Sequence, residues 1–487
     1  MTFEFRDLGA LKHGVMKLND LTIISGSNNS GKTYVSYTLC GYLILWRQFV
    51  TFKKFHGSLY QKLLEDGEAM ISPDDIVAEA QKALAESCQD YSRSLHKVLA
   101  GTSKHLEKNK FFAKDLDFDH FKKEGFKETA SRAKKALVRV SYEGGETPIK
   151  VSFLADVESL TDPHETANLA LDFLDKVLVE HIVGPLFPEV FIASAERTGA
   201  TIFQKELDLA RNRLIEQIGE SSGPPSGDLD LFSVISKIAS DYALPVKADI
   251  DFIRGIESFS KEESWLAETH PSILEDFQEI IGGEYKTVKN QGTLFLPKGA
   301  KGVKLTMGES SSAVRSLLNV GAYLRHRAAP GQLLIIDEPE LNLHPSNQRK
   351  VARLLARLVN VGIKVFITTH SDYLIKELNT LIMLSPQHPH LKKVMAKEGY
   401  KEEELLKVES LNVYQAKLGS CKFGDMIRAA KGMTLCPAKI DKDQGIWIES
   451  FDEEIEEMDR IQSAILYGDD AVEIEDADEK ITLEQYS

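Results

Sequence analysis

The chain has 487 residues, of which 43% are apolar and 27% are charged, as is typical of a soluble, folded protein with more than one substructure. Its net charge of −15 is uneven, because residues 449–487 hold 15 acidic and 2 basic side chains and leave the rest nearly neutral. No apolar run near the start could span a bilayer, and the first residues do not resemble a signal peptide. With only four scattered cysteines, we expect a cytoplasmic protein.

The first third of the chain predicts strands around a glycine loop, followed by helices. Residues 3–24 alternate and then end in LTIISG, which predicts a hairpin and a buried strand leading into the loop. The apolar-rich residues after Thr33 predict a buried helix. Residues 52–135 predict helices, and two alternating runs in 136–155 predict a β-hairpin.

The remainder predicts an α/β arrangement. A helix begins at Pro163, a strand lies in PEVFIASAER, and residues 203–282 are mostly helical around a loop at 221–228. Further strand signals are a pair within 284–306, LLIID and KVFITTH on either side of a helix, and two strands beyond residue 408.

We therefore predict an α/β P-loop NTPase of the ABC-ATPase type, with antiparallel β-hairpins and a large helical insertion. The expected parts are residues 1–51 and 136–205 for the N-terminal part of the ATPase head, 52–135 for the helical insertion, 206–283 for a helical lobe, 284–448 for the C-terminal part of the head, and 449–487 for an acidic helix and tail.

The stretch GSNNSGKT has the spacing G-x-x-x-x-G-K-T, which has a chance of about 2% of arising at random in a chain of this length. Its place between a strand and a helix predicts a phosphate-binding loop. Backbone N–H groups would surround the phosphates, Lys32 would reach the β- and γ-phosphates, and the Thr33 hydroxyl would ligate Mg²⁺. The predicted ATP-binding residues here are Gly26, Ser27, Asn28, Asn29, Ser30, Gly31, Lys32, Thr33 and Tyr34.

Two later strands end in polar residues that suit phosphate chemistry. LLIIDEPELNLHP delivers Asp337, which can hold Mg²⁺, and Glu338, which can accept a proton from the attacking water. The strand in VFITTH ends in His370, which can hydrogen-bond the γ-phosphate. Lys32, Glu338 and His370 are the predicted catalytic residues.

A serine-rich turn, MGESSSAVRSLL, precedes an amphipathic helix, and an ordinary N-cap would explain it equally well. As a functional element it would be a second phosphate clamp. Ser311, Ser312 and Ala313 would then contact a nucleotide held by another copy of the chain.

Together these motifs resemble the ABC-type ATPase heads of the SMC, RecF and OLD proteins. GSNNSGKT, ASAER, SSSAV and DEPELNLHP are most similar to OLD-like bacterial ATPases. The resemblance covers about residues 1–50 and 284–380, and weakly 186–200. It implies a head-to-tail homodimer that holds two ATP molecules, in which the serine-rich segment of each copy completes the other's site.

The same resemblance suggests a role in anti-phage defence. OLD nucleases carry a Toprim nuclease domain after the ATPase, and the residues after His370 show no matching pattern of strand and acids. We therefore expect a stand-alone ATPase that controls a separate effector protein, a nuclease or a toxin.

Two other functions remain open. One is a RecF-like or SMC-like ATPase that binds duplex DNA, suggested by the ten basic and six acidic residues of 104–135, although a solvated helix face explains these equally well. The other is a scaffold in which bound ATP is structural.

Overall fold

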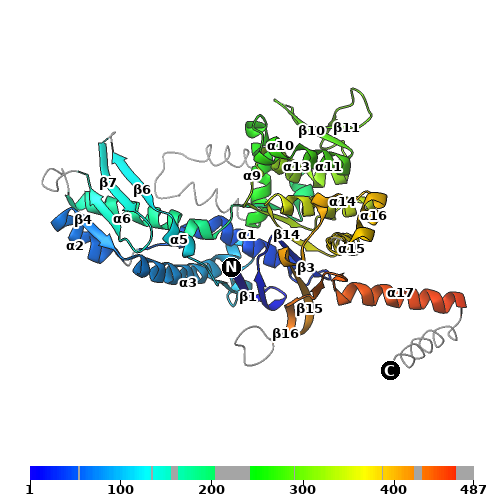
Figure 1. Ribbon diagram of the computed structural model, residues 1–487, viewed down its shortest axis with the longest axis horizontal. Helices are drawn as coiled ribbons and strands as arrows, with labels where there is room; N and C mark the ends of the chain where they lie inside the picture. Colours follow the sequence, from blue (N-terminus) through cyan, green and yellow to red (C-terminus); the bar gives the residue numbers. More distant parts are fainter. Residues whose placement is uncertain are drawn as a thin grey trace, which may run out of the picture.

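A computed structural model describes residues 1–52, 55–132, 135–154, 163–202, 242–289, 291–386, 388–421 and 430–467. The expected head lies at the centre of the molecule, and an elongated lobe extends from it along helix α3 (Pro73–Val98) (Figure 1). A short sheet projects from another side of the head, and helix α17 (Glu449–Tyr467) extends outward near the C-terminus (Figure 1).

The head is built on a nine-stranded mixed sheet in the order β5-β1-β2-β16-β15-β3-β14-β13-β9. From β15 to β9 neighbouring strands are parallel, whereas β5, β1 and β2 pair antiparallel. The strands are β1 (Thr2–Leu8), β2 (Leu11–Lys17), β3 (Leu21–Gly26), β5 (Lys110–Lys114), β9 (Val190–Ala193), β13 (Leu333–Asp337), β14 (Lys364–Thr369), β15 (Leu411–Cys421) and β16 (Ala430–Pro437).

The central parallel strands β3, β14 and β13 are buried on both faces because each face packs against helices. In β13, Ile335 belongs to one apolar core and its neighbours Leu334 and Ile336 belong to the other, as the alternation along a strand requires. The first core is completed by α1 (Lys32–Phe49), α3, α6 (Pro163–Leu178) and α9 (Leu244–Phe259). The second is completed by α11 (Pro271–Ile281), α13 (Leu318–His326), α14 (Pro345–Asn360) and α15 (Asp372–Met383).

The lobe differs from the predicted helical insertion. It contains α2 (His56–Asp66), α3, α4 (Ser103–Leu106) and α5 (Asp119–Lys123), but three strands also lie within 52–135. Strand β5 joins the edge of the head sheet beside β1. The other two, β4 (Glu68–Ile71) and β6 (Phe126–Arg132), form a separate antiparallel sheet in the order β4-β8-β7-β6 with β7 (Lys135–Tyr142) and β8 (Ile149–Phe153).

The predicted hairpin at 136–155 is therefore real, but it belongs to the sheet of the lobe and not to the head. The physical reason is that a further strand pairs on each side of the hairpin: β4, which is distant in the sequence, pairs with β8, and β6, which directly precedes β7, pairs with β7. Short strands of this kind carry little local signal, because their stability comes from pairing.

The predicted helical lobe at 206–283 is helical where it is described, in α9, α10 (Trp265–Thr269) and α11. Residues 203–241, with the predicted loop at 221–228, lie outside the described residues. The strand pair predicted in 284–306 is β10 (Gly283–Val288) and β11 (Gly292–Pro297). A third, short strand, β12 (Leu305–Thr306), pairs with β11 in the same sheet.

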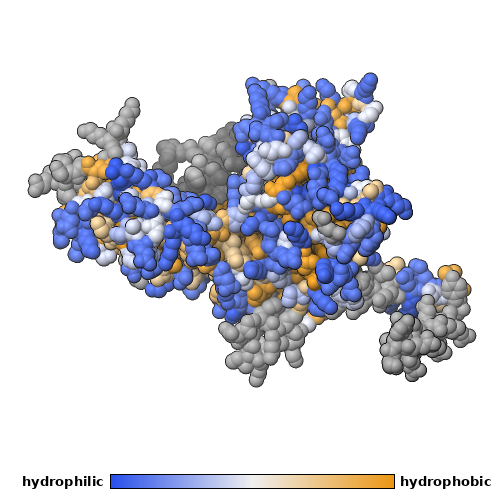
Figure 2. Space-filling view, in the orientation of Figure 1, coloured by the Kyte–Doolittle hydropathy of each residue, from blue (hydrophilic) through white to orange (hydrophobic). Residues whose placement is uncertain are grey.

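The C-terminal elements are two short strands, β17 (Ile440–Asp441) and β18 (Gly445–Ile446), and the predicted acidic helix, α17. Ile465 and Leu466 near the end of α17 are 77% and 72% exposed, and Figure 2 shows apolar side chains on this helix as well as over the middle of the head. Residues 468–487 lie outside the described residues. None of the helices in the described ranges combines the length and apolar character needed to cross a membrane.

Candidate nucleotide site

The glycine loop connects strand β3 to helix α1, as the sequence predicts. Gly26 has φ 155°, and a Cβ atom there would lie 2.6 Å from the backbone oxygen of Ala416 on β15, so a larger residue cannot fit without a shift. Gly31 is the N-cap of α1, with φ 93°. The loop thus brings backbone close to backbone at the carboxyl edge of the parallel strands, where ligands bind in such sheets.

Lys32, the first residue of α1, folds back over the loop. Its Nζ donates hydrogen bonds of 2.8 Å to the carbonyl oxygens of Gly26 and Ser27. Burial lowers the pKa of this ammonium group, and the nearby carboxylates of Glu338 and Asp337 oppose that shift. A negatively charged phosphate at this position would favour the charged form in the same way.

A cavity of about 550 Å³ opens over the loop. Its walls come from the glycine loop, the start of α1, the turn after β1 and the ends of β13 and β14. The lining residues are Ala10, Asn28, Asn29, Ser30, Gly31, Lys32, Thr33, Tyr34, Glu338 and His370. The structure therefore brings the three predicted catalytic residues together in one cavity, although Glu338 and His370 lie more than 300 residues after the loop.

Asp337 lies at the end of β13 and is completely buried. The hydroxyl of Thr368 donates a hydrogen bond to Oδ1, while Oδ2 has no hydrogen-bond partner within the described part of the chain. Burial raises the pKa of Asp337 to about 6, although the hydroxyls of Thr368 and Thr33 lower it in part. A buried carboxylate with an unused oxygen is costly unless a cation or another donor pairs with it.

These groups fit a magnesium site. Mg²⁺ in nucleotide sites is held by few protein oxygens, together with phosphate oxygens and water. Asp337 supplies a carboxylate and Thr33, which lines the cavity, supplies a hydroxyl. Within the described ranges no group of three or more His, Cys, Asp or Glu side chains could hold a metal by itself, so the phosphates would have to complete the coordination.

Glu338 follows directly and has a left-handed backbone, with φ 53°. For a residue other than glycine this conformation costs about 1–3 kcal/mol and persists only where the surrounding structure enforces it. The N–H of Glu338 donates to the carbonyl oxygen of Thr368 at 3.1 Å. The side chain faces the cavity and is 23% exposed.

His370 lies between two carboxylates. Its Nδ1 is 3.6 Å from Oε1 of Glu338 and 3.3 Å from Oε1 of Glu340. The bond to Glu338 raises the pKa of His370, and Glu340 adds to the shift. The same bond lowers the pKa of Glu338 and thereby favours its ionised form at neutral pH.

The serine-rich segment forms the short helix α12 (Ser312–Ser316), which leads into α13. Ser311 is its N-cap, as the simpler interpretation predicts, and its side chain accepts a hydrogen bond from the N–H of Val314 at 3.3 Å. Ser311 and Ser312 are exposed. Of the described residues, neither serine nor Ala313 lines the cavity over the glycine loop.

Sequence reasoning missed several residues that support the site. Glu340 is buried, and its Oε1 accepts from the Thr369 hydroxyl and the His370 N–H, both at 2.8 Å. Arg197, which follows the predicted strand in PEVFIASAER, is completely buried and donates a hydrogen bond to the carbonyl oxygen of Glu338. The second acid of DEPE was a usable signal for Glu340, whereas nothing in the local sequence reveals the contacts of Arg197.

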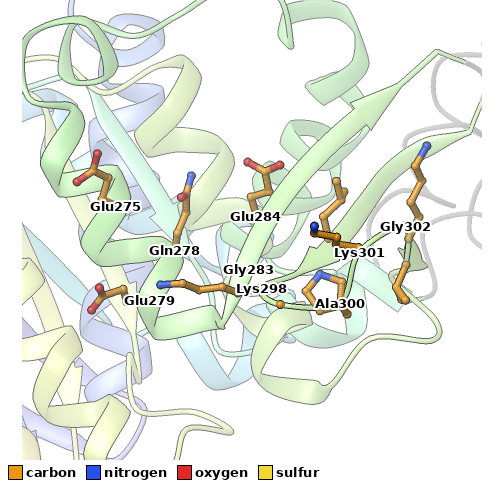
Figure 3. A pocket seen from close by; sticks show the side chains of 14 residues that line it. Glu275, Gln278, Glu279, Gly283, Glu284, Lys298, Ala300, Lys301 and Gly302 are labelled. Atoms are coloured by element: carbon orange, nitrogen blue, oxygen red, sulfur yellow. The ribbon is translucent and has the colours of Figure 1, made fainter.

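A second cavity, of about 780 Å³, lies away from the glycine loop, between α11 and the loop that joins β11 to β12. Figure 3 shows Glu275 and Glu279 of α11 on one side of it and Lys301 of the loop on the other, with the side chain of Lys298 extending toward α11 in this view. We call residues 298–304, KGAKGVK, the lysine loop; Lys298, Lys301 and Lys304 in it are exposed.

Comparisons with known proteins show the family of the chain. Residues 3–375 match the family model described as AAA ATPase domain, which covers more than half of the chain; the chain belongs to this family. The fold is that of a P-loop ATPase of the ABC type.

Curated relatives match only part of the chain. UvrABC system protein A of Thermus thermophilus is 26% identical over 149 residues, which are 31% of this chain and 14% of that protein. The protein of the same name from Streptococcus pneumoniae serotype 4 is 28% identical over 116 residues, 23% of this chain and 12% of that protein. The chain thus matches about a seventh or less of the length of these relatives.

Among solved structures, the chain is similar to an SMC head domain from Thermotoga maritima, with 10% identity, a TM-score of 0.28, and coverage of 90% of this chain and 98% of that one. It is also similar to an SMC head bound to the C-winged helix domain of ScpA, with 11% identity, a TM-score of 0.30, and coverage of 77% and 91%.

Proposed function

We propose that this protein is an ATP-hydrolysing molecular switch of the OLD-like group, which closes as a head-to-tail homodimer around two ATP molecules and regulates a separate effector. The observation that carries the proposal is the single cavity in which the glycine loop, Glu338 and His370 meet. The exposed, N-capped turn at Ser311 and Ser312 is available to a neighbour, as a contact made in trans requires.

In the proposed reaction the loop N–H groups and Lys32 bind the phosphates, and Thr33 and Asp337 would hold Mg²⁺. When bound, Mg²⁺ would neutralise charge on the β- and γ-phosphates. Glu338 takes a proton from water while the water oxygen bonds to the γ-phosphorus. The bond from that phosphorus to the bridging oxygen breaks, which yields ADP and inorganic phosphate, and His370 orients the water and the γ-phosphate.

The test is multiple-turnover phosphate release with Mg²⁺ and ATP, combined with sedimentation analysis with and without nucleotide. We expect turnover and an ATP-dependent dimer in the unmodified chain. Lys32→Ala should lose both, whereas Lys350→Ala, a matched change of an exposed lysine on α14, should lose neither. A chain that binds ATP and dimerises without releasing phosphate would instead be the scaffold considered above.

The defence role rests on the resemblance of the motifs and requires a cellular test. Phage plating on cells that carry the chain with the genes encoded beside it should fall, and Glu338→Gln should abolish that protection. Equal plating with and without the chain over a broad phage panel would count against this role.

A second candidate function, duplex DNA binding, is favoured by the lysine loop and not by residues 104–135. In the latter stretch Lys114 bonds Glu4 and Lys122 bonds Asp74, so part of its positive charge is already paired. The lysine loop instead makes two consecutive turns, closed by hydrogen bonds from Ala300 N–H to Pro297 O and from Val303 N–H to Ala300 O. Each turn places an exposed lysine at its second position.

Binding of a labelled 30-base-pair duplex over a range of salt concentrations tests this function. Loss of three lysine–phosphate contacts should reduce the magnitude of the slope of log affinity against log salt by about 2.7. The variant changes the three lysines of the lysine loop to Gln. The matched control changes three exposed lysines on α14 and α16 (Pro389–Glu398): Lys350, Lys392 and Lys393. Equal slopes in the two variants would exclude the lysine loop as the contact.

A further inference from the structure

Arg197 is a cation in the interior of the head, for which the proposed reaction has assigned no role. It lies just after β9, and its side chain is among the largest that are completely buried. Burial lowers the pKa of its guanidinium, while the carboxylates of Asp249, Asp337, Glu340 and Glu338 oppose the shift. Since a buried charge is costly, a residue of this kind needs a specific set of partners.

The partners are backbone oxygens of three separate segments. Nη1 donates to the carbonyl oxygens of Ser194, at 2.8 Å, and Asp337, at 2.5 Å. Nη2 donates to the carbonyl oxygen of Glu338 at 2.6 Å, and Nε donates to that of Ser316 at 2.8 Å. The planar fork of arginine can meet acceptors in several directions at once, which the single ammonium of lysine cannot reproduce.

Two hydrogen bonds, one of them from Arg197, fix the backbone of the proposed general base. The Glu338 N–H is held by Thr368 on β14, and the Glu338 carbonyl is held by Arg197. The residue is therefore bound on both sides in its left-handed conformation, and this conformation sets the direction in which the side chain leaves the backbone. Loss of the second attachment would let the peptide relax and move the carboxylate.

The bond to Ser316 connects the same side chain to α12. Ser316 is the last residue of that short helix, whose N-cap is Ser311. A parallel link lies beside it, because the Thr201 hydroxyl lies 2.9 Å from the Arg197 oxygen and 3.3 Å from the Arg315 oxygen. A further bond joins the Ser316 hydroxyl to the Leu341 carbonyl oxygen at 3.3 Å. The helix expected to touch the neighbouring copy and the segment after β13 thus share one buried hydrogen-bond network.

We propose that Arg197 is a positioning residue that couples the seating of α12 to the placement of the Glu338 carboxylate. Through Arg197, contact between a neighbouring copy and the N-terminal end of α12 changes the position of the Glu338 carboxylate in the same chain as that helix. This inference rests on the proposed ATPase function and adds to it a path by which dimer contact regulates hydrolysis.

The first test is Arg197→Lys, which keeps the charge and removes the fork. We expect turnover to fall about 100-fold, since small misplacement of a reacting group costs about this much, with affinity for a fluorescent ATP analogue unchanged within about twofold. Amide hydrogen exchange should rise at residues 312–317 and 338–342 together and stay unchanged along α1. A uniform rise across the head would indicate a structural role alone and overturn the proposal.

A double-mutant cycle with Ser311→Ala measures the coupling itself. Removing the N-cap should reduce turnover about fivefold in the unmodified chain and less than about twofold in the Arg197→Lys background. Equal factors in both backgrounds, or no effect of Ser311→Ala in the unmodified chain, would overturn the coupling.

Two further outcomes are separable. Absence of turnover in the unmodified chain would refute the ATPase function, and this inference with it, whereas normal turnover in both chains would refute only the role of Arg197. If Arg197→Lys does not fold, Thr201→Val weakens the same network without touching the buried charge. That variant should reduce both turnover and the Ser311→Ala effect, and unchanged values of both would overturn the proposal.

Discussion

Glu338→Gln is the substitution that most directly tests the assignment of the base. The two side chains have the same shape, so the left-handed backbone and its bonds to Thr368 and Arg197 should persist. What changes is the ability to accept a proton. General bases contribute about 10²- to 10⁴-fold to a rate, so turnover should fall by that factor, equivalent to about 2.7–5.4 kcal/mol of activation free energy.

The lower part of that range is expected because the pKa of Glu338 is lowered, chiefly by His370, and a carboxylate of lower pKa is a weaker base. At neutral pH the carboxylate is ionised in almost every molecule, so the substitution removes the base throughout the sample. The free energy of unfolding should change little. The contact with His370 is 3.6 Å long between side chains that are 42% and 23% exposed, and pairs of this kind contribute about 0–1 kcal/mol.

The assay measures phosphate release at saturating ATP, binding of a fluorescent ATP analogue, and the melting temperature. Glu457→Gln on the exposed face of α17 is the matched control, with no expected effect. Turnover within about threefold of the unmodified chain would show that Glu338 is not the base. Loss of nucleotide binding along with turnover would show that its main role is in binding.

Three further results are expected. His370→Ala removes the main cause of the lowered pKa of Glu338. The acidic limb of the pH–rate profile, on which turnover falls as Glu338 is protonated, should therefore move to higher pH. An unmoved limb would show that His370 does not set the pKa of Glu338. Because the Asp337 carboxyl has a pKa of about 6, the Mg²⁺ concentration for half-maximal turnover should rise about tenfold per pH unit below that value, and Asp337→Asn should abolish this dependence. Gly26→Ala places a Cβ atom 2.6 Å from a backbone oxygen. It should lower the free energy of unfolding by about 1–3 kcal/mol in urea titrations and abolish ATP binding. Gly419→Ala, where a Cβ atom meets nothing within 4 Å, should do neither.

The parts of the fold that sequence predicts best are those with local causes. Strands β3, β13 and β14 are continuous apolar runs because both of their faces are covered. Each leads into residues whose types indicate phosphate or metal binding or proton transfer. The glycine loop is fixed by steric needs at Gly26 that only one residue type meets. These signals sufficed to predict which elements would deliver Lys32, Glu338 and His370 to one site.

The parts that failed have non-local causes. Strands β4 and β5 pair with strands far away in the chain, so a segment read as helical contributes to two different sheets. Strand β6 pairs with β7, which follows it directly. The role of Arg197 depends on carbonyl oxygens from segments up to 141 residues away, and a carbonyl oxygen leaves no trace in the residue types. Prediction from sequence therefore identifies the groups that face the nucleotide more readily than those that hold them in place.

The adjacent acids Asp337 and Glu338 show how that supporting structure divides the chemistry. Burial raises the pKa of Asp337 to about 6, whereas the bond to His370 lowers the pKa of Glu338. Asp337 continues the extended strand and stays inside the sheet edge, with an oxygen free for a cation. The left-handed turn at Glu338 instead delivers the next carboxylate to the open cavity. One carboxylate is buried with an oxygen that has no partner in the described part of the chain, and the other faces the cavity, so their positions suit two different tasks, metal binding and proton transfer. The backbone conformation that separates them is the one that Arg197 and Thr368 hold.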